Sequence, residues 1–308
     1  MPTAKTATAP ARERCSTLFF VTTGKHEDGQ RRLNLLYTAL HRHEERLSKA
    51  DPDFEEGSSL AQDSARSAVL QPGFRAYFHL RSTYEFLDSI GRLVRERKSF
   101  SPFGVEQAMG RTALLGACKA IYLLEPGSSD ARLMRCAMLA LEDDKSSLRE
   151  IKDTLKVLGE DDSLHPTWKA WGAKLEKDAA AVRGEAELLG ITLTAWRGDG
   201  ELFRHVGEYL DKVTPLPQPE DLEPSKSISH EAILVRYWNQ TSGYVHAHTW
   251  PFMRLAKPTA GTNELTIAVH TDDVVGLLMV IWDILDNAIE LLDRRGCRHD
   301  PGASFVRA

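Results

Sequence analysis

The 308-residue sequence lacks most of the motifs that indicate a chemistry by themselves. It has no glycine-rich phosphate loop, no H-E-x-x-H zinc motif and no G-x-S-x-G nucleophile turn. Its four cysteines, Cys15, Cys118, Cys136 and Cys297, form no C-x-x-C pair, which is typical of a reduced cytoplasmic chain rather than a disulfide framework. We therefore predict neither a metal site nor a cofactor.

The sequence also lacks an excess of positive charge and a long apolar run. With 44 acidic and 39 basic residues its formal charge is −5, which argues against binding nucleic acid or acidic membranes through overall charge but leaves room for a local basic patch. The N-terminal stretch MPTAKTATAPARERC has no apolar signal-peptide core. The uncharged run VVGLLMVIW, 274–282, is far shorter than the roughly 20 residues that span a membrane. We expect a soluble cytoplasmic protein that does not bind membranes.

Helical periodicity of apolar residues is the dominant pattern that is present. The clearest example is near the C-terminus, where the spacings are 4, 3, 4, 3 and 4: Val274, Leu278, Ile281, Leu285, Ala288 and Leu292. Only LTIAV, at 265–269, has the composition of a short strand, and a single strand makes no sheet. The sequence therefore predicts an all-α fold, a helical bundle with at most one short strand.

The segment VEQAMGRTALLGACKAIYLL, 105–124, differs from the other helical segments. It is apolar on nearly every face, and after Glu106 its only charges are Arg111 and Lys119. A helix that is apolar all round is buried at the centre of a fold. We therefore predict one central buried helix here, and we expect Leu115→Asp to prevent folding by placing an unpaired charge in the core.

Proline and composition suggest where the domain begins and ends. The stretch TPLPQPEDLEP, 214–224, has four prolines and predicts a linker, because proline interrupts a regular helix. We predict a flexible tail over 1–28, a single helical domain over 29–294 that includes this linker, and a C-terminal tail over 295–308. The first 60 or so residues are expected to be loosely attached to the rest.

The densest polar and aromatic stretch is RYWNQTSGYVHAHTW, 236–250. Ser242 and His246 are four residues apart, so on a helix they share one face. His246 can serve as a general acid or base or as a phosphate ligand, since imidazole titrates near neutral pH. The alternative is a hydrogen bond between helices in a half-buried polar layer. Both interpretations remain open from the sequence.

Arginine side chains provide the other candidates. Arg111 lies within the apolar central segment and must find a partner, either a carboxylate on a neighbouring helix or an anionic ligand. Arg132 and Arg135, one turn apart, either extend such a ligand-binding cluster or lie on a solvated face. We expect Arg111 to lie near Ser242 and within about 12 Å of His246, a reach that one bridging water or ligand allows.

Three stretches together resemble a known superfamily: GRTALLGACKAIYLLEP, then ARLMRCAML with Arg132 and Arg135, and later YWNQTSGYVHAH. The pattern is similar to uncharacterised bacterial helical proteins that distantly resemble the HEPN nucleotide-binding and ribonuclease superfamily. The resemblance spans roughly 105–290 and implies an α-helical bundle, often dimeric, with RNA cleavage in some relatives.

The chain departs from that superfamily where catalysis would be expected. Its relatives tend to carry a glutamate about one turn after the arginine, and residues Thr112 to Gly116 contain none. Catalytic members use R-x(4–6)-H, which Arg236 and His246 do not fit because nine residues separate them. Arg294 and His299 match the spacing only in the tail. Ribonuclease activity is therefore not transferred to this chain on the resemblance.

Three functions remain as hypotheses. The leading one is a HEPN-like helical binding protein without a catalytic motif, with RNA or another protein as partner and a homodimer as a possible assembly. The second is a metal-independent ribonuclease or toxin-like enzyme in which His246, Arg111 and Ser242 are the candidate catalytic residues. The third is a small-ligand sensor with an aromatic pocket, whose candidate lining residues are Tyr237, Trp238, Tyr244 and Trp250.

Overall fold

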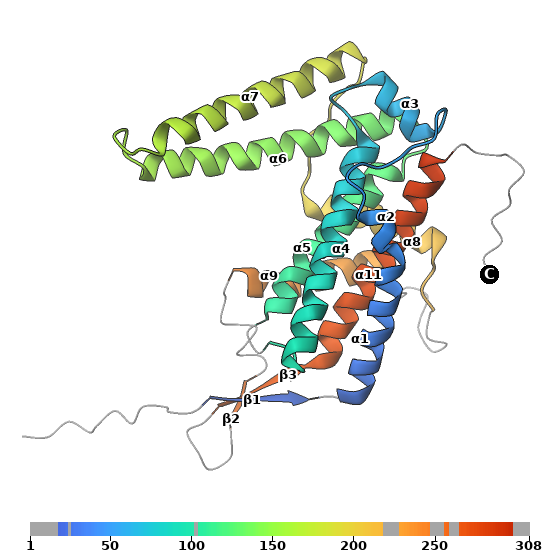
Figure 1. Ribbon diagram of the computed structural model, residues 1–308, viewed down its shortest axis with the longest axis vertical. Coiled ribbons are helices and arrows are strands. Elements are labelled where there is room, and N and C mark those ends of the chain that lie inside the picture. Colours follow the sequence, from blue (N-terminus) through green and yellow to red (C-terminus); the bar gives the residue numbers. More distant parts are fainter. Residues whose placement is uncertain are drawn as a thin grey trace, which may run out of the picture.

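The protein folds as a helical bundle with a long helical hairpin that extends from one end and a small sheet at the other (Figure 1). The computed structural model describes residues 18–23, 26–101, 104–217, 228–246, 256–258 and 265–297. Within these residues the predicted helical bundle is confirmed. None of the described helices is both long enough and apolar enough to cross a membrane.

The helices follow one another with short connections. Their bounds are α1 His26–Leu40, the 3₁₀ turn η1 His41–His43, α2 Glu44–Leu47, α3 Ser59–Arg66, α4 Pro72–Arg97, α5 Val105–Leu124, α6 Ser129–Val157, α7 His165–Leu188, α8 Asp199–Val213, α9 His230–Val245 and α11 Thr271–Gly296. Helices on both sides of the predicted linker contribute to one hydrophobic core. Residues 218–224 of that linker lie outside the described residues.

Helix α5 is the central helix, as the sequence predicts. It packs against α4, α8, α9 and α11. The side chains of Leu114, Cys118 and Ile121 are completely buried. Leu115, however, is only half-buried and faces a cleft beside Lys119. The expectation that Leu115 belongs to the core is therefore wrong by one position, because the apolar character of α5 extends over its cleft-facing side as well.

The N-terminal helices belong to the core, contrary to the prediction that they are loosely attached. Leu33, Leu40 and Leu47 are at most 2% exposed, and α1 packs along α11. The Tyr37 hydroxyl donates a hydrogen bond of 2.8 Å to the Leu87 carbonyl oxygen of α4. Their leucine spacing, read as a separate amphipathic helix, is the face that covers α4 and α11.

A three-stranded sheet corrects the prediction of at most one short strand. Strands β1 Leu18–Thr23, β2 Ala256–Pro258 and β3 Leu265–His270 lie in the order β1-β3-β2. β1 and β3 are parallel, with Leu18 opposite Leu265, whereas β2 is antiparallel to β3. The strand predicted at 265–269 therefore finds its partner within the segment predicted to be a flexible tail, at the opposite end of the chain.

The hairpin of α6 and α7 extends away from the bundle (Figure 1). The first turns of α6 are buried in the core through Leu133, Cys136 and Ala137, whereas α7 packs mainly against α6. At the seam, a Cβ added to Gly172 would lie 3.3 Å from the side chain of Ile151, so the two helices approach closely. We call the part of α6 from Leu141 onward, together with α7, the arm.

Candidate functional site

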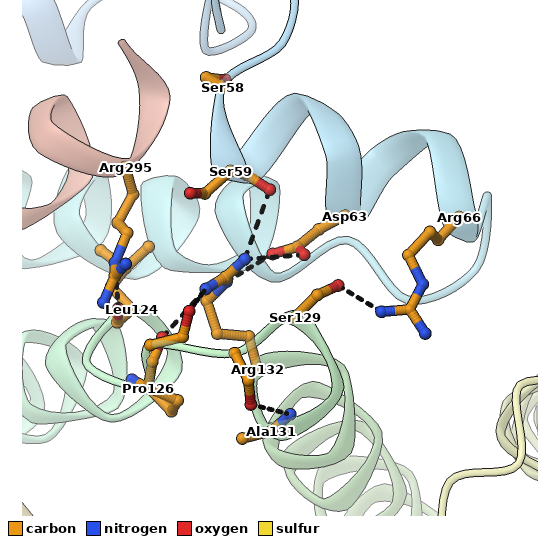
Figure 2. A network of polar contacts seen from close by, with 12 residues as sticks. Ser58, Ser59, Asp63, Arg66, Leu124, Pro126, Ser129, Ala131, Arg132 and Arg295 are labelled. Carbon is orange, nitrogen blue, oxygen red and sulfur yellow. Dashed lines mark hydrogen bonds and ion pairs between the residues drawn. The ribbon is translucent and has the colours of Figure 1, made fainter. Parts of the chain in front are cut away.

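Arg132, one of the predicted ligand-binding residues, is sealed inside the bundle (Figure 2). Its guanidinium forms a bidentate ion pair with Asp63 of α3, with N–O distances of 2.6 and 2.9 Å. The remaining N–H groups donate to the carbonyl oxygens of Ser59, Pro126 and Gly127. All five donors are thus occupied by the chain itself, which assigns Arg132 a structural role and leaves it no donor for a ligand.

Two further arginines cover the C-terminal end of α5, where the helix leaves carbonyl oxygens without helical partners. Arg135 donates to the Tyr122 carbonyl oxygen at 2.8 Å and to the Glu125 carboxylate at 3.0 Å. Arg295 of α11 donates to the carbonyl oxygens of Leu124 and Glu125. Burial and the nearby Arg132 charge lower the pKa of Arg295. Cations also suit the negative end of the helix dipole, so the predicted arginine cluster stabilises this helix end.

Arg111, the first predicted catalytic residue, lies against an aromatic ring. Its Cζ atom is 3.4 Å from the centroid of the Trp238 ring, an approach typical of a cation–π contact. One of its guanidinium nitrogens is buried and makes no hydrogen bond with the described residues. Burial lowers the pKa of Arg111, and the negative charge of Asp199 opposes that effect. The structure therefore gives Arg111 neither of the two partners expected from the sequence.

Ser242 and His246 lie further along α9, at its C-terminal end. Ser242 is half-buried and His246 is exposed. They come one and two turns after Trp238, so His246 lies about 12 Å further along the helix axis than the residue that Arg111 contacts. Helix α9 runs antiparallel to α5, because Tyr244 packs against Gly104, just before α5 begins. Ser242 and His246 therefore extend away from Arg111, and catalysis by the three together stays a prediction that no described contact supports.

The predicted aromatic residues point to three different neighbours rather than into one pocket. The Tyr237 hydroxyl packs against Gly276 of α11. Trp238 lies between Arg111 and Phe203 of α8, with its ring centroid 5.3 Å from that of Phe203. Tyr244 packs against the backbone before α5, as described above. Trp250 lies outside the described residues. Among the described residues, the aromatic side chains of α9 thus join helices.

A groove of about 520 Å³ on the arm is the site that sequence reasoning missed. Its floor is apolar and includes Met138, Leu141, Leu148 and Trp196. Its edges carry five basic side chains: Lys145, Arg149, Lys152, Lys156 and Arg183. Four of these recur on α6 at spacings of 4, 3 and 4, a helical stripe that was available in the sequence but that was hidden by the apolar stripe beside it.

The groove has a local excess of positive charge. Two carboxylates line it, and each is paired within α6: Glu142 with Lys145 at 3.0 Å, and Asp153 with Lys156 at 2.7 Å. Arg149, Lys152 and Arg183 form no ion pair with any described residue, and all three are exposed. Three positive charges therefore border an apolar floor on a chain whose overall charge is negative.

The described residues contain no group of histidine, cysteine, aspartate and glutamate side chains arranged to hold a metal ion. Burial raises the pKa of the thiols of Cys118 and Cys136, which keeps them protonated and poorly nucleophilic. Comparisons with protein-family models, with curated proteins and with solved structures returned no match for this chain.

Proposed function

We propose that this chain is a helical binding protein of HEPN-like type that uses the groove of the arm to hold an acidic, amphipathic helix of a protein partner. The observation that carries the proposal is the combination in one groove of an apolar floor and three unpaired cations, Arg149, Lys152 and Arg183. Apolar side chains of a partner would fill the floor, and its carboxylates would meet the cations at the edges.

The dimensions and position of the groove support a helical occupant. The lining residues of α6 run from Met138 to Lys156, which is about 27 Å of helix at 1.5 Å per residue. A partner helix of similar length would lie beside two helices that otherwise pack mainly on each other, which completes a three-helix arrangement. The HEPN-like part of the proposal rests on the sequence resemblance and on the helical fold alone.

An apolar floor favours a peptide over RNA. Single-stranded RNA is usually held by aromatic side chains that stack on successive bases. The groove offers one tryptophan, Trp196, whose ring packs edge-on against Tyr122 at a centroid distance of 5.7 Å. Aliphatic side chains such as Leu141 and Leu148 suit leucine or methionine anchors instead. A protein partner is therefore the better match to the described groove.

The test uses a fluorescently labelled synthetic peptide of about 20 residues, with leucines on one helical face and glutamates on the other. We expect saturable binding by fluorescence anisotropy at 0.15 M salt, and weaker binding at higher salt because the exposed charges are screened. The double variant Arg149→Glu/Lys152→Glu should lose at least about tenfold in affinity, since two attractive charges become repulsive.

The matched control is Lys169→Glu/Lys177→Glu, which makes the same charge change at exposed lysines of α7 outside the groove lining. We expect it to change affinity by less than about twofold. Equal losses in both double variants would contradict a defined groove and indicate attraction through overall charge. Tighter binding of a labelled 20-nucleotide poly(U) RNA, abolished by Arg149→Glu/Lys152→Glu, would assign the groove to nucleic acid and contradict the proposed partner.

A further inference from the structure

A second pocket lies on the bundle, between the segment before α4 and the first turns of α4. Its volume is about 420 Å³, which is within the range of small-molecule sites. Four apolar side chains line it: Ala68, Val69, Phe74 and Phe78. The remaining lining residues are polar: Gln71, Arg75, His79 and Asp143. It is distinct from the groove of the arm, with which it shares no lining residue.

The apolar half of this pocket is unusually exposed for a folded core. Phe78 is 46% and Val69 is 38% exposed, although both are large apolar side chains. The rings of Phe74 and Phe78 meet edge to face, with centroids 4.7 Å apart. Two adjacent phenyl rings open to solvent form a surface on which a third aromatic ring can pack.

The polar half leaves one positive charge without a carboxylate. Arg75 forms no ion pair with any described residue; it lies beside the thiol of Cys136 and close enough to Asp144 to lower that carboxyl's pKa, an effect outweighed by burial. Asp143 is already paired with Lys119 at 3.0 Å. Burial and the Lys119 charge lower the pKa of His79 to about 4, so its ring is neutral at pH 7 and adds no charge.

We infer that this pocket binds an aromatic monocarboxylate. The aromatic ring packs on Phe74 and Phe78, and the carboxylate accepts a charge-assisted, bidentate pair of hydrogen bonds from Arg75. The neutral His79 ring, which has one N–H, is placed in the lining to donate a further hydrogen bond to the same group. The inference is independent of the function proposed for the arm, because it rests on other residues.

The probe is 3-phenylpropanoate, titrated into the full-length protein and followed by calorimetry and ligand-observed NMR. We expect saturable binding with a Kd of about 1 mM, the affinity that so small a ligand can reach. Two control compounds separate the contributions: 3-phenylpropan-1-ol keeps the ring without the charge, and propanoate keeps the charge without the ring. Both should bind at least about tenfold more weakly than the probe.

Two variants locate the site, and each has a matched control. Arg75→Met removes the charge but keeps an unbranched side chain, and Phe78→Ala removes an exposed ring whose loss costs the fold little. Each should weaken binding of the probe at least about tenfold. Arg81→Met, at an arginine further along α4, and Leu35→Ala, at a leucine that is 64% exposed, should leave the Kd within about twofold.

Several results would overturn the inference. These are no saturable binding of 3-phenylpropanoate up to about 20 mM, equal binding of 3-phenylpropan-1-ol, or an unchanged Kd in Phe78→Ala. Circular dichroism checks that Arg75→Met is folded. If Arg75→Met does not fold, Phe78→Ala decides the apolar half and the comparison of acid with alcohol decides the charged half, so either can still contradict the inference.

Discussion

Arginine side chains show at the residue scale how different the surroundings of one residue type are in this fold. Arg132 is 2% exposed and satisfied by five acceptors, whereas Arg111 lies on the face of Trp238 with one buried nitrogen unbonded. Arg149 is exposed at the edge of the groove. All three lie on helices that also carry apolar stripes. Their surroundings are set by which helix passes opposite them, and that depends on residues far away in the sequence.

The buried pair of Arg132 and Asp63 leads to a prediction about stability. Asp63→Ala should lower the free energy of unfolding by about 3–5 kcal/mol, because it leaves a buried guanidinium without its counter-charge. The double variant Asp63→Leu/Arg132→Met should recover most of that loss, since it removes both charges together. Urea unfolding followed by circular dichroism measures each difference.

The control for this prediction is Arg66→Met, which breaks an ion pair of 2.7 Å between Arg66 and Asp130 on the surface nearby. Its cost should be below about 1 kcal/mol because exposed pairs contribute little. If Asp63→Ala cost no more than Arg66→Met, the buried pair would not be the stabilising contact that we describe.

Helix α5 shows at the element scale that a buried helix still has a wet side. Leu114 is completely buried, whereas Leu115, its neighbour, lines a cleft together with Lys119, Asp143 and Asp199. Burial raises the pKa of Asp199, and Lys119 opposes that effect. Adjacent residues on a helix point about 100° apart, so the same residue type has different surroundings one position along.

This difference predicts unequal costs for two otherwise identical substitutions. Leu114→Ala should destabilise the protein by about 2–5 kcal/mol, because it opens a cavity in a core that cannot relax completely. Leu115→Ala should cost about 1 kcal/mol, since the side chain already borders solvent. Thermal unfolding of the two variants in the same buffer gives the comparison. Equal losses would show that the core of α5 is placed on the wrong face.

The arm shows at the scale of the whole molecule that the bundle and its extension are built differently. The bundle shares one core that includes the N-terminal helices and the helices after the linker. In contrast, α7 has four buried residues, Gly172, Ala179, Val182 and Ala186, and packs mainly on α6. Large apolar side chains at the arm's end and outer face, Val157, Leu164 and Trp171, are exposed. The arm therefore contributes little to the core and presents surface.

Removal of the outer arm should leave the bundle folded. Ile151 lies opposite Gly172, so Lys145 and Asp178 lie opposite each other across the hairpin, and a short glycine-rich loop can join them in place of 146–177. We expect a cooperatively unfolding helical protein whose melting temperature is lower by less than about 10 °C, because the deleted helices bury little core. Circular dichroism measures this, and the shortened protein should not bind the acidic peptide.

A non-cooperative transition or an insoluble product would contradict this prediction. It would show that the arm stabilises the bundle, and the surface on the arm would then be a by-product of folding. A folded product that still binds the peptide with unchanged affinity would instead remove the arm from the proposed function.

The sequence by itself determined the features that depend on local pattern. Apolar spacing identifies the helices, a segment apolar on every face identifies α5 as central, and proline and glycine mark helix ends. These signals are local because a helix forms its hydrogen bonds within a few residues. The basic stripe of α6 was equally local and could have been identified from its spacing of 4, 3 and 4.

Only the tertiary structure decided which of these segments meet. Strand β1 pairs with β3 across almost the whole chain, and a strand has no hydrogen-bonding partner within itself, so a lone candidate at 265–269 could not be completed from the sequence. Arg111 reaches Trp238 rather than His246 because α9 runs antiparallel to α5. The groove exists because α6 continues beyond the bundle and α7 returns along it. Packing between distant segments sets each of these, and local periodicity carries no information about it.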